Sequence, residues 1–256
     1  MRIERTIGVT VAVLGSLLLA VSGTVPALAR GGPAAGLARS AGVRLADLAV
    51  PTSTSFGGWV FKPKAATSVT AKFKVPALKC TKFLTGVGPV AVMVTGTSAA
   101  PKLNAAGLLL TCVSKKAVMR PVVRVDGTPT IGSNKVAAGD LIQSTITTSA
   151  SKTTATVADL TKGHTFKLTK SGKGAAAFRE GIIDNALTGT KSGKQLPIAN
   201  FGKISFTACA VGGKAIGSVT PRAAVNLQSK KKVLRIVTGP ITGTAKNAFT
   251  TTWKHS

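Results

Sequence analysis

Short runs in which apolar and polar residues alternate follow one another along most of the chain. In SVTAKFKVP, residues 68–76, Val69, Ala71, Phe73 and Val75 are separated by Ser, Thr and Lys. Because successive side chains of a strand point to opposite faces, this pattern predicts a strand with one buried and one solvated face. Runs that alternate in this way or are wholly apolar occupy residues 88–94, 107–113, 117–125, 140–148, 153–160, 164–169, 202–210, 232–237 and 247–253.

Turn-forming residues separate these runs, and no long helical period interrupts them. Asp126-Gly127, Lys162-Gly163 and Gly212-Gly213 are typical turn pairs. Short strands at this spacing, rich in Val and Thr, predict an all-β fold: an antiparallel β-sandwich of two sheets, or a barrel. We expect one such domain over residues 56–256, since about 200 residues suffice for a single all-β unit.

The N-terminal segment differs from the rest of the chain. Arg2 and Arg5 precede an apolar run over residues 7–21, and the small residues Ala27 and Ala29 follow it. This arrangement indicates a secretory signal peptide over residues 1–29, because the run of about 15 residues is short of the roughly 20 that span a bilayer. Residues 30–55, rich in Gly, Ala, Pro and Ser, predict a flexible leader or pro-segment. We therefore expect a secreted, extracellular protein with no membrane span after signal cleavage.

The chain is strongly cationic, with 34 Lys and Arg against 7 Asp and Glu and a formal net charge of +27. Such a surface attracts polyanions in general. The lysines are spread along the chain, there is no Tyr and there are two Trp, whereas nucleic-acid-binding surfaces interleave cations with aromatic residues. A solvated surface is the first interpretation and adhesion to anionic cell-envelope polymers or peptides the second. Specific nucleic-acid binding is disfavoured.

All three cysteines, Cys80, Cys112 and Cys209, follow the signal segment, and disulfides persist in exported proteins. Sequence alone does not fix their connectivity. We favour Cys80 with Cys112, because both follow strand-like runs and the closed loop would contribute about 3–4 kcal/mol in the chain-entropy model. Cys209 is then expected to be a small buried side chain. With no Cys-x-x-Cys pair and two histidines, a metal site is not expected.

The common catalytic constellations have few candidate residues here. A Ser-His-Asp or Cys-His site needs a held histidine, and the chain offers His164, which follows a predicted turn, and His255, next to the last residue. The sequence contains no P-loop, Gly-x-Gly-x-x-Gly or His-Glu-x-x-His motif, so no cofactor is expected. Glu180 and Asp184, in REGIIDN, project to the same side of a strand or roughly the same face of a helix. They could serve acid/base chemistry or balance local charge from Arg179 and the lysines.

Five segments in order carry a resemblance to a known family. They are SVTAKFKVP (68–76), LLLTCV (108–113), the Gly-Asp-initiated hairpin of residues 137–163, EGIID (180–184) and IANFGKISFTA (198–208). Together they resemble the eqolisins, the glutamic peptidases, over about residues 56–250. The resemblance implies a concanavalin A-like sandwich of two curved antiparallel sheets with a substrate cleft on its concave face. It also implies a Glu as general base on the attacking water and a Gln that orients this water and stabilises the oxyanion.

The chain departs from the family pattern at both catalytic positions. Leu110 matches the Gln and has no polar side-chain atom, and Asp184 matches the general-base Glu with a side chain one methylene shorter. Glu180 matches the first acid of the motif, Gly181 the Trp between the acids, and residues 117–127 the aromatic stretch that lines the cleft. Losing an oxyanion donor costs about a hundred- to a thousandfold in turnover, and displacing a catalytic group by roughly 1 Å costs about another hundredfold.

The sequence therefore favours a non-catalytic, secreted, eqolisin-like β-sandwich that binds at the cell exterior. The alternative is an active acid endopeptidase of the glutamic type that uses Asp184. In that case Gln143 or Gln195 could replace the missing amide if the alignment is offset.

Overall fold

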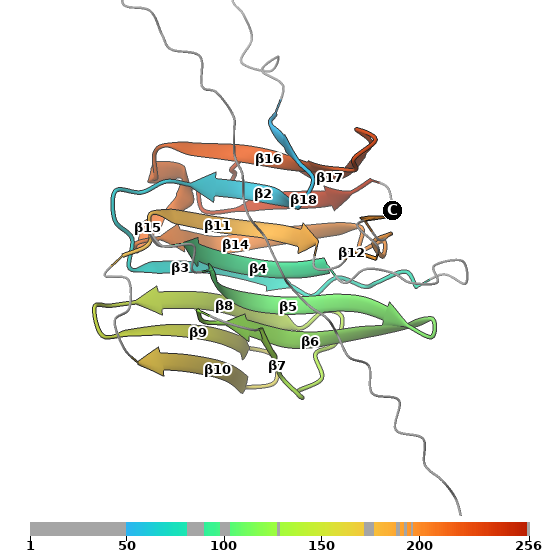
Figure 1. The fold of residues 1–256 in the computed structure, drawn as a ribbon, viewed down its shortest axis with the longest axis horizontal. Coiled ribbons are helices and arrows are strands. Elements are labelled where there is room, and N and C mark those ends of the chain that lie inside the picture. The colour runs from blue at the N-terminus through green and yellow to red at the C-terminus, as the bar shows by residue number, and fades with distance from the viewer. Residues whose placement is uncertain are drawn as a thin grey trace, which may run out of the picture.

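The computed structural model describes residues 50–80, 90–97, 103–126, 129–171, 177–187, 190–191, 194–195 and 197–254. Strands dominate this part of the chain, and its one helical turn is the 3-10 segment η2 (Ile216–Ser218). The strands are stacked in two layers against each other (Figure 1). The predicted all-β class is confirmed.

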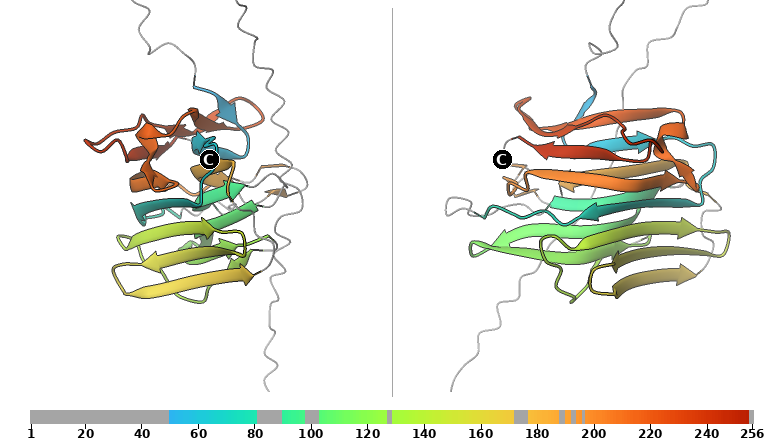
Figure 2. Two further views of the ribbon diagram at one scale, coloured as in Figure 1. Left: turned by 90° about the vertical axis from the view of Figure 1, so that its left-hand side faces the viewer. Right: turned by 180° about the vertical axis from the view of Figure 1, so that it is seen from behind.

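The first layer, here called the β3 layer, is antiparallel throughout. Its strands in spatial order are β10 (His164–Ser171), β9 (Lys152–Asp159), β8 (Leu141–Thr148), β3 (Ser68–Lys74), β14 (Lys203–Val211), β18 (Phe249–Trp253) and β17 (Leu234–Thr238). This layer faces the viewer when the molecule is seen from behind (Figure 2, right).

The second layer, here called the β11 layer, is also antiparallel. Its strands in order are β16 (Arg222–Gln228), β2 (Phe56–Phe61), β11 (Glu180–Leu187), β4 (Val90–Thr97), β5 (Leu103–Val113), β6 (Lys116–Arg124) and β7 (Thr130–Ile131). Pairing of β16 with β17, with Leu227 opposite Ile236, joins the two layers along one edge. The fold is thus a β-sandwich whose layers are continuous at one side.

Short strands complete the structure at the periphery. They are β1 (Thr52–Ser53), parallel to β16, β15 (Lys214–Ala215), beside β14, and the pair β12 (Thr190–Lys191) and β13 (Lys194–Gln195). β1 lies inside the predicted leader 30–55, so paired structure begins a few residues before Phe56. The predicted signal peptide lies outside the described residues. No helix in the described ranges is long and apolar enough to cross a membrane.

The core forms where the alternation of the sequence predicts it. Val69, Ala71, Phe73 and Val75 are all buried and belong to one large apolar cluster between the layers. Aromatic rings fill its centre: the Phe206 ring lies 4.7 Å from that of Phe249 and 5.6 Å from that of Phe73, between centroids. Offset or tilted ring pairs at such distances add to the stabilisation that burial alone provides.

The favoured cysteine pairing is confirmed. A disulfide joins Cys80, after β3, to Cys112, near the end of β5, with a Cα–Cα distance of 5.6 Å. Cys209 is a free, buried thiol, and burial raises its pKa to about 12. It therefore behaves as a small apolar side chain of the core, as the sequence predicts.

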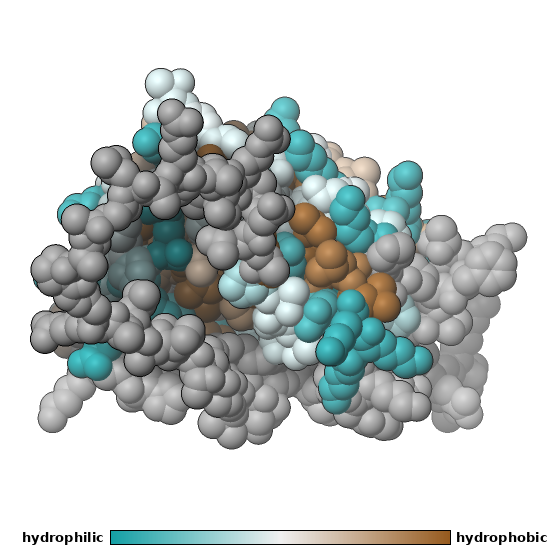
Figure 3. Space-filling model, turned by 90° about the horizontal axis from the view of Figure 1, so that it is seen from above, coloured by the Kyte–Doolittle hydropathy of each residue, from teal (hydrophilic) through white to brown (hydrophobic). Residues whose placement is uncertain are grey.

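Apolar side chains also reach the surface at one side of the molecule. Seen from above, a group of hydrophobic residues at the surface is bordered by hydrophilic ones (Figure 3). Val233 and Leu234, next to each other between β16 and the body of β17, are exposed by 47% and 40%. A few exposed apolar residues are normal for a folded domain.

Candidate functional site

Asp184 lies at the middle of the β11 layer, on the face that points away from the core. β11 is paired on both sides, so that Asp184 stands opposite Gly58 of β2 and opposite Met93 of β4. Its neighbour Ile183 points the other way, into the main core cluster. Asp184, Gly58 and Met93 therefore share one face, which we call the outer face of the β11 layer.

The carboxyl of Asp184 is buried even though it faces outward. Asp184 is only 4% exposed, and its Oδ1 accepts no hydrogen bond from the described residues. A small apolar cluster of Phe56, Ile182 and Val225, with Val60 against it, lies on the same face beside it. Burial raises the pKa of Asp184 well above its ordinary value, because an apolar setting disfavours the charged form.

Two glycines shape the outer face around Asp184. A Cβ on Gly58 would lie 2.3 Å from the Ile183 carbonyl oxygen and 2.7 Å from the Asp184 Cβ. A Cβ on Gly107 of β5 would lie 2.0 Å from the Val92 carbonyl oxygen and 2.6 Å from the Met93 Cα. Cβ atoms of ordinary strand partners are about 4.5–5.5 Å apart, so the strands converge on this side and the face curves inward there.

Leu110 lies on the opposite face from Asp184. It stands opposite Met119 of β6, is 1% exposed and belongs to the core cluster between the layers. On β5 the residue in line with Asp184 is instead Gly107, which pairs with Met93. The structure therefore does not bring together the two positions that match the family's catalytic pair.

Gln143 and Thr111 are also distant from Asp184, whereas the buried Thr95 of β4 shares the outer face two residues from Met93. Gln143 lies on β8, which belongs to the β3 layer. Its neighbours Ile142 and Ser144 are buried, so the Gln143 side chain points away from the core. Thr111 shares the outer face with Gly107 but stands four residues further along β5, about 13 Å away. The side chain of Gln195 lies outside the described part of the structure.

Glu180 shares the outer face with Asp184 but not its surroundings. It begins β11, pairs with Thr97 and accepts a hydrogen bond from the Thr97 hydroxyl at 3.4 Å. Four residues of strand span about 13 Å, too far for the two carboxyls to share a proton. Glu180 is half-buried, and its hydrogen bond links the ends of β11 and β4 instead of reaching Asp184.

Cations of β6 line the far side of the same face. Leu109 pairs with Arg120 and Ala105 with Arg124, which places both arginines on the outer face, on either side of Val122. Arg120 is exposed, whereas Arg124 is half-buried and its Nε has no acceptor among the described residues. Burial lowers the pKa of Arg124. Both arginines lie in residues 117–127, the stretch that by the eqolisin resemblance matches the aromatic lining of the family's cleft.

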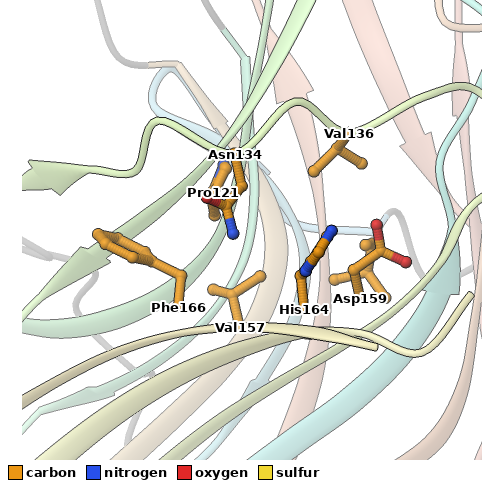
Figure 4. A pocket seen from close by; sticks show the side chains of 8 residues that line it. Pro121, Asn134, Val136, Val157, Asp159, His164 and Phe166 are labelled. Carbon is orange, nitrogen blue, oxygen red and sulfur yellow. The ribbon is translucent and has the colours of Figure 1, made fainter. Parts of the chain in front are cut away.

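A separate small pocket opens between the layers at the edge away from β16. Its lining includes Pro121 and Val136 above, and Val157, Asp159 and His164 below (Figure 4). Asp159 is held by the turn that follows it, because its Oδ1 accepts the backbone N–H groups of Thr161 and Lys162 at 3.0 Å each. Among the described residues no Ser or Cys lines this pocket, so none of them offers His164 a nucleophile to activate there.

The second acid near this pocket, Asp140, also has its carboxylate bound to neighbouring groups. Asp140 forms an ion pair with Lys162 at 2.6 Å and accepts the Ala137 N–H, and these contacts hold its pKa below the ordinary value against the effect of burial. Among the described residues no group of three or more His, Cys, Asp or Glu side chains could hold a metal ion. The contacts of Asp140 and Asp159 therefore stabilise the turns beside the pocket.

Sequence reasoning missed the residues that surround Asp184. Gly58 and Met93 carry no catalytic motif, and Phe56, Ile182 and Val225 come together only through strand pairing. One signal was present: FGGWVF places a glycine pair inside a strand, and glycine within a strand often marks a close approach of neighbouring backbone.

Comparisons with known proteins agree with this architecture. The Peptidase A4 family profile matches residues 54–247. A structure of scytalido-glutamic peptidase with a transition-state analogue inhibitor superposes with a TM-score of 0.61 at 15% identity, covering 79% of this chain and 99% of that one. SCP-B, an eqolisin in complex with the tripeptide Ala-Ile-His, gives 0.58 at 15% identity with the same coverage.

Aspergilloglutamic peptidase from Aspergillus niger gives a TM-score of 0.52 at 17% identity, covering 65% of this chain and 99% of that one. A search of curated proteins finds no match. At these identities the structural likeness establishes the fold alone, and the profile match establishes the family that the five sequence segments predict.

Proposed function

Because the chain belongs to the Peptidase A4 family, we propose that it is a secreted, non-catalytic member that binds polypeptide segments at the cell exterior. The binding surface is the outer face of the β11 layer. The observation that carries this proposal is the position of Asp184, whose face offers no amide partner among the described side chains.

The family's reaction, as the resemblance implies it, needs two groups at one water molecule. A carboxylate takes the proton and an amide orients the water and stabilises the oxyanion, so both must reach the same point. Here the matched positions, Asp184 and Leu110, project from opposite faces of one layer. The residues in register with Asp184 are Gly58 and Met93, neither of which donates a side-chain hydrogen bond.

The protonation state of Asp184 also opposes catalysis at acidic pH. A general base must be ionised to accept a proton from water. Burial raises the pKa of Asp184 well above its ordinary value, so the carboxyl keeps its proton to a higher pH than an ordinary aspartate does. A neutral carboxyl can still donate a hydrogen bond to a ligand carbonyl, which is a binding role.

The remainder of the outer face suits a ligand with both apolar and acidic side chains. Met93, Leu109 and Val122 are half-buried and lie in the inward-curving part of the face. Arg120 is exposed beside them and offers a fork of donors for a carboxylate. The predicted signal peptide and the net charge of +27 support action outside the cell, where anionic surfaces and peptides occur.

The direct test is endopeptidase activity of the exported protein on a mixed peptide library from about pH 2 to about pH 7, beside an Asp184→Ala variant. We expect no cleavage by either. We also expect the immobilised wild type to retain library peptides and Arg120→Glu to retain fewer, with Lys64→Glu, an exposed loop residue, as a control of equal charge change. Cleavage that Asp184→Ala abolishes would overturn the proposal.

One observation favours a second candidate, an acid endopeptidase that uses Asp184. A strongly perturbed carboxyl in a concave face is a common feature of active sites. Asp184-dependent cleavage in the same assay would establish this candidate. The search would then turn to the group that replaces the missing amide.

A further inference from the structure

The face of the β3 layer that points away from the core has an unusual composition. Over five of the seven strands, β3, β8, β9, β10 and β14, it consists of their alternate residues, and we call this part the threonine face. Apart from Leu141, Gln143, Ala158, Ala208 and Ala210, these outward positions carry Thr, Ser or Lys. The intervening residues of the inner strands of this set, such as Val69, Ile146 and Phe206, are buried in the core.

Strand register arranges the hydroxyls in rows across the layer. One row runs from Lys167 through Thr156 and Thr145 to Thr70. Neighbouring strands are about 4.8 Å apart and alternate residues of one strand about 6.7 Å apart, so the hydroxyls form a regular grid.

Two hydrogen bonds hold parts of this grid in place. Thr70 and Thr145 share a hydrogen bond at 2.8 Å between their hydroxyls. Thr154 and Thr169, in the adjacent row, share one at 3.1 Å. Side chains fixed in this way lose less freedom when a ligand binds to them.

The lysines of the threonine face have no acidic neighbour there. Lys72, Lys74, Lys167 and Lys203 all project outward, and no Asp or Glu occupies an outward position of these strands. Of the described acids, Asp140 and Asp159 are buried near the β9–β10 turn, Asp126 follows β6 of the other layer, and Glu180 and Asp184 lie on that layer too. The face is therefore uniformly cationic.

These features select a partner by its chemistry. The outward positions include no aromatic residue, which disfavours stacked nucleobases and the aromatic anchors usual in protein interfaces. They include Lys but no Arg, and a lysine ammonium binds phosphate as a point charge, without the planar bidentate geometry by which Arg pairs with either carboxylate or phosphate. Hydroxyls between the lysines can donate to the remaining phosphoryl oxygens.

We infer that the threonine face binds a linear polymer that carries repeated phosphate groups and no bases. The polymer lies across the strands, with its phosphates near the lysines and its other oxygens on the threonine rows. This surface is separate from the outer face of the β11 layer, so the two proposals can fail independently.

The test compares two triple variants of the exported protein with equal loss of charge. Lys72→Gln/Lys167→Gln/Lys203→Gln alters the threonine face, and Lys64→Gln/Lys214→Gln/Lys231→Gln removes exposed lysines elsewhere. The probe is long-chain inorganic polyphosphate, and affinity is measured over a range of salt concentrations. We expect the threonine-face variant to bind at least about tenfold more weakly than the control, with a salt slope reduced by about two units.

Equal weakening in both variants would overturn the inference, because it would show attraction by net charge alone. A Thr145→Val/Thr156→Val variant keeps the charge and removes two hydroxyls, and we expect it to bind polyphosphate several-fold more weakly. Unchanged affinity in this variant would contradict the inference. So would tighter binding of alginate, a polycarboxylate, or of single-stranded DNA than of polyphosphate, with thermal unfolding used to confirm that every variant is folded.

Discussion

Asp184 and Leu110 lie two strands apart in the β11 layer and project from its opposite faces. Asp184 is in register with Met93, and Met93 with Gly107, so the residue of β5 on the Asp184 side is a glycine three positions before Leu110. A one-residue change of register reverses the face on which a strand side chain lies. An amide at position 110 would therefore not face Asp184, so the catalytic pair is missing through the direction of this side chain as well as through its residue type.

The buried carboxyl should make stability depend on pH. Because the pKa of Asp184 is raised in the folded state, the folded protein holds this proton more tightly than the unfolded chain. The resulting stabilisation is complete below the ordinary value of 3.8 and is lost as pH rises toward the folded pKa. The change amounts to about 1.4 kcal/mol per pH unit in that window.

Asp184→Asn should remove this dependence while keeping the shape of the side chain. We expect the variant to gain stability relative to the wild type as pH rises above about 4, measured as the free energy of unfolding in denaturant at several pH values. Glu180→Gln, which removes a carboxyl from the same strand, is the control for net charge. A constant difference between Asp184→Asn and wild type across the pH range would show that Asp184 is not buried as described.

Gly58→Ala should destabilise the fold at the candidate site. The new Cβ would lie 2.3 Å from the Ile183 carbonyl oxygen and 2.6 Å from the Asp184 Cα, both of them backbone atoms. Overpacking of this kind costs about 1–3 kcal/mol. Gly202→Ala is the control for backbone strain without overpacking, since an alanine is strained at its φ of +65° but nothing lies within 4 Å of the added carbon. A loss for Gly58→Ala no greater than for Gly202→Ala would argue against the close approach of β2 and β11.

The thiol chemistry follows from the pairing of Cys80 with Cys112. A thiol reagent should label no cysteine in the native protein, because Cys209 is buried and its pKa is raised to about 12. It should label one after unfolding without reductant. The Cys80→Ala/Cys112→Ala variant should lose about 3–4 kcal/mol of stability in the chain-entropy model. Rapid labelling of native wild type would contradict the burial of Cys209.

The sequence predicts the β3 layer better than the β11 layer. β3, β8 and β9 each have one apolar and one polar face, so their alternation is plain to read. β2 and β11 were not among the predicted runs. FGGWVF contains two glycines, and EGIIDNAL contains two acids and a glycine, which hide the strand pattern.

The candidate site also has features that the sequence predicts and features that it does not. Even spacing places Glu180 and Asp184 on one face of a strand, and local sequence suffices for that. The isolation of Asp184 depends on Gly58, Met93 and Val225, which come from three different segments and meet through strand register. Register across a sheet is a non-local property that a single sequence does not reveal.

The most direct test of the account is peptide cleavage by Leu110→Gln. If Leu110 faces the core, the new amide is buried without partners, and we expect a loss of about 1–3 kcal/mol in stability and no cleavage at any pH from about 2 to about 7. Leu110→Met, which keeps an apolar side chain of similar volume, should cost less than about 1.5 kcal/mol. Cleavage by Leu110→Gln that disappears when Asp184→Ala is added would show that the two residues share a face, and would contradict the account.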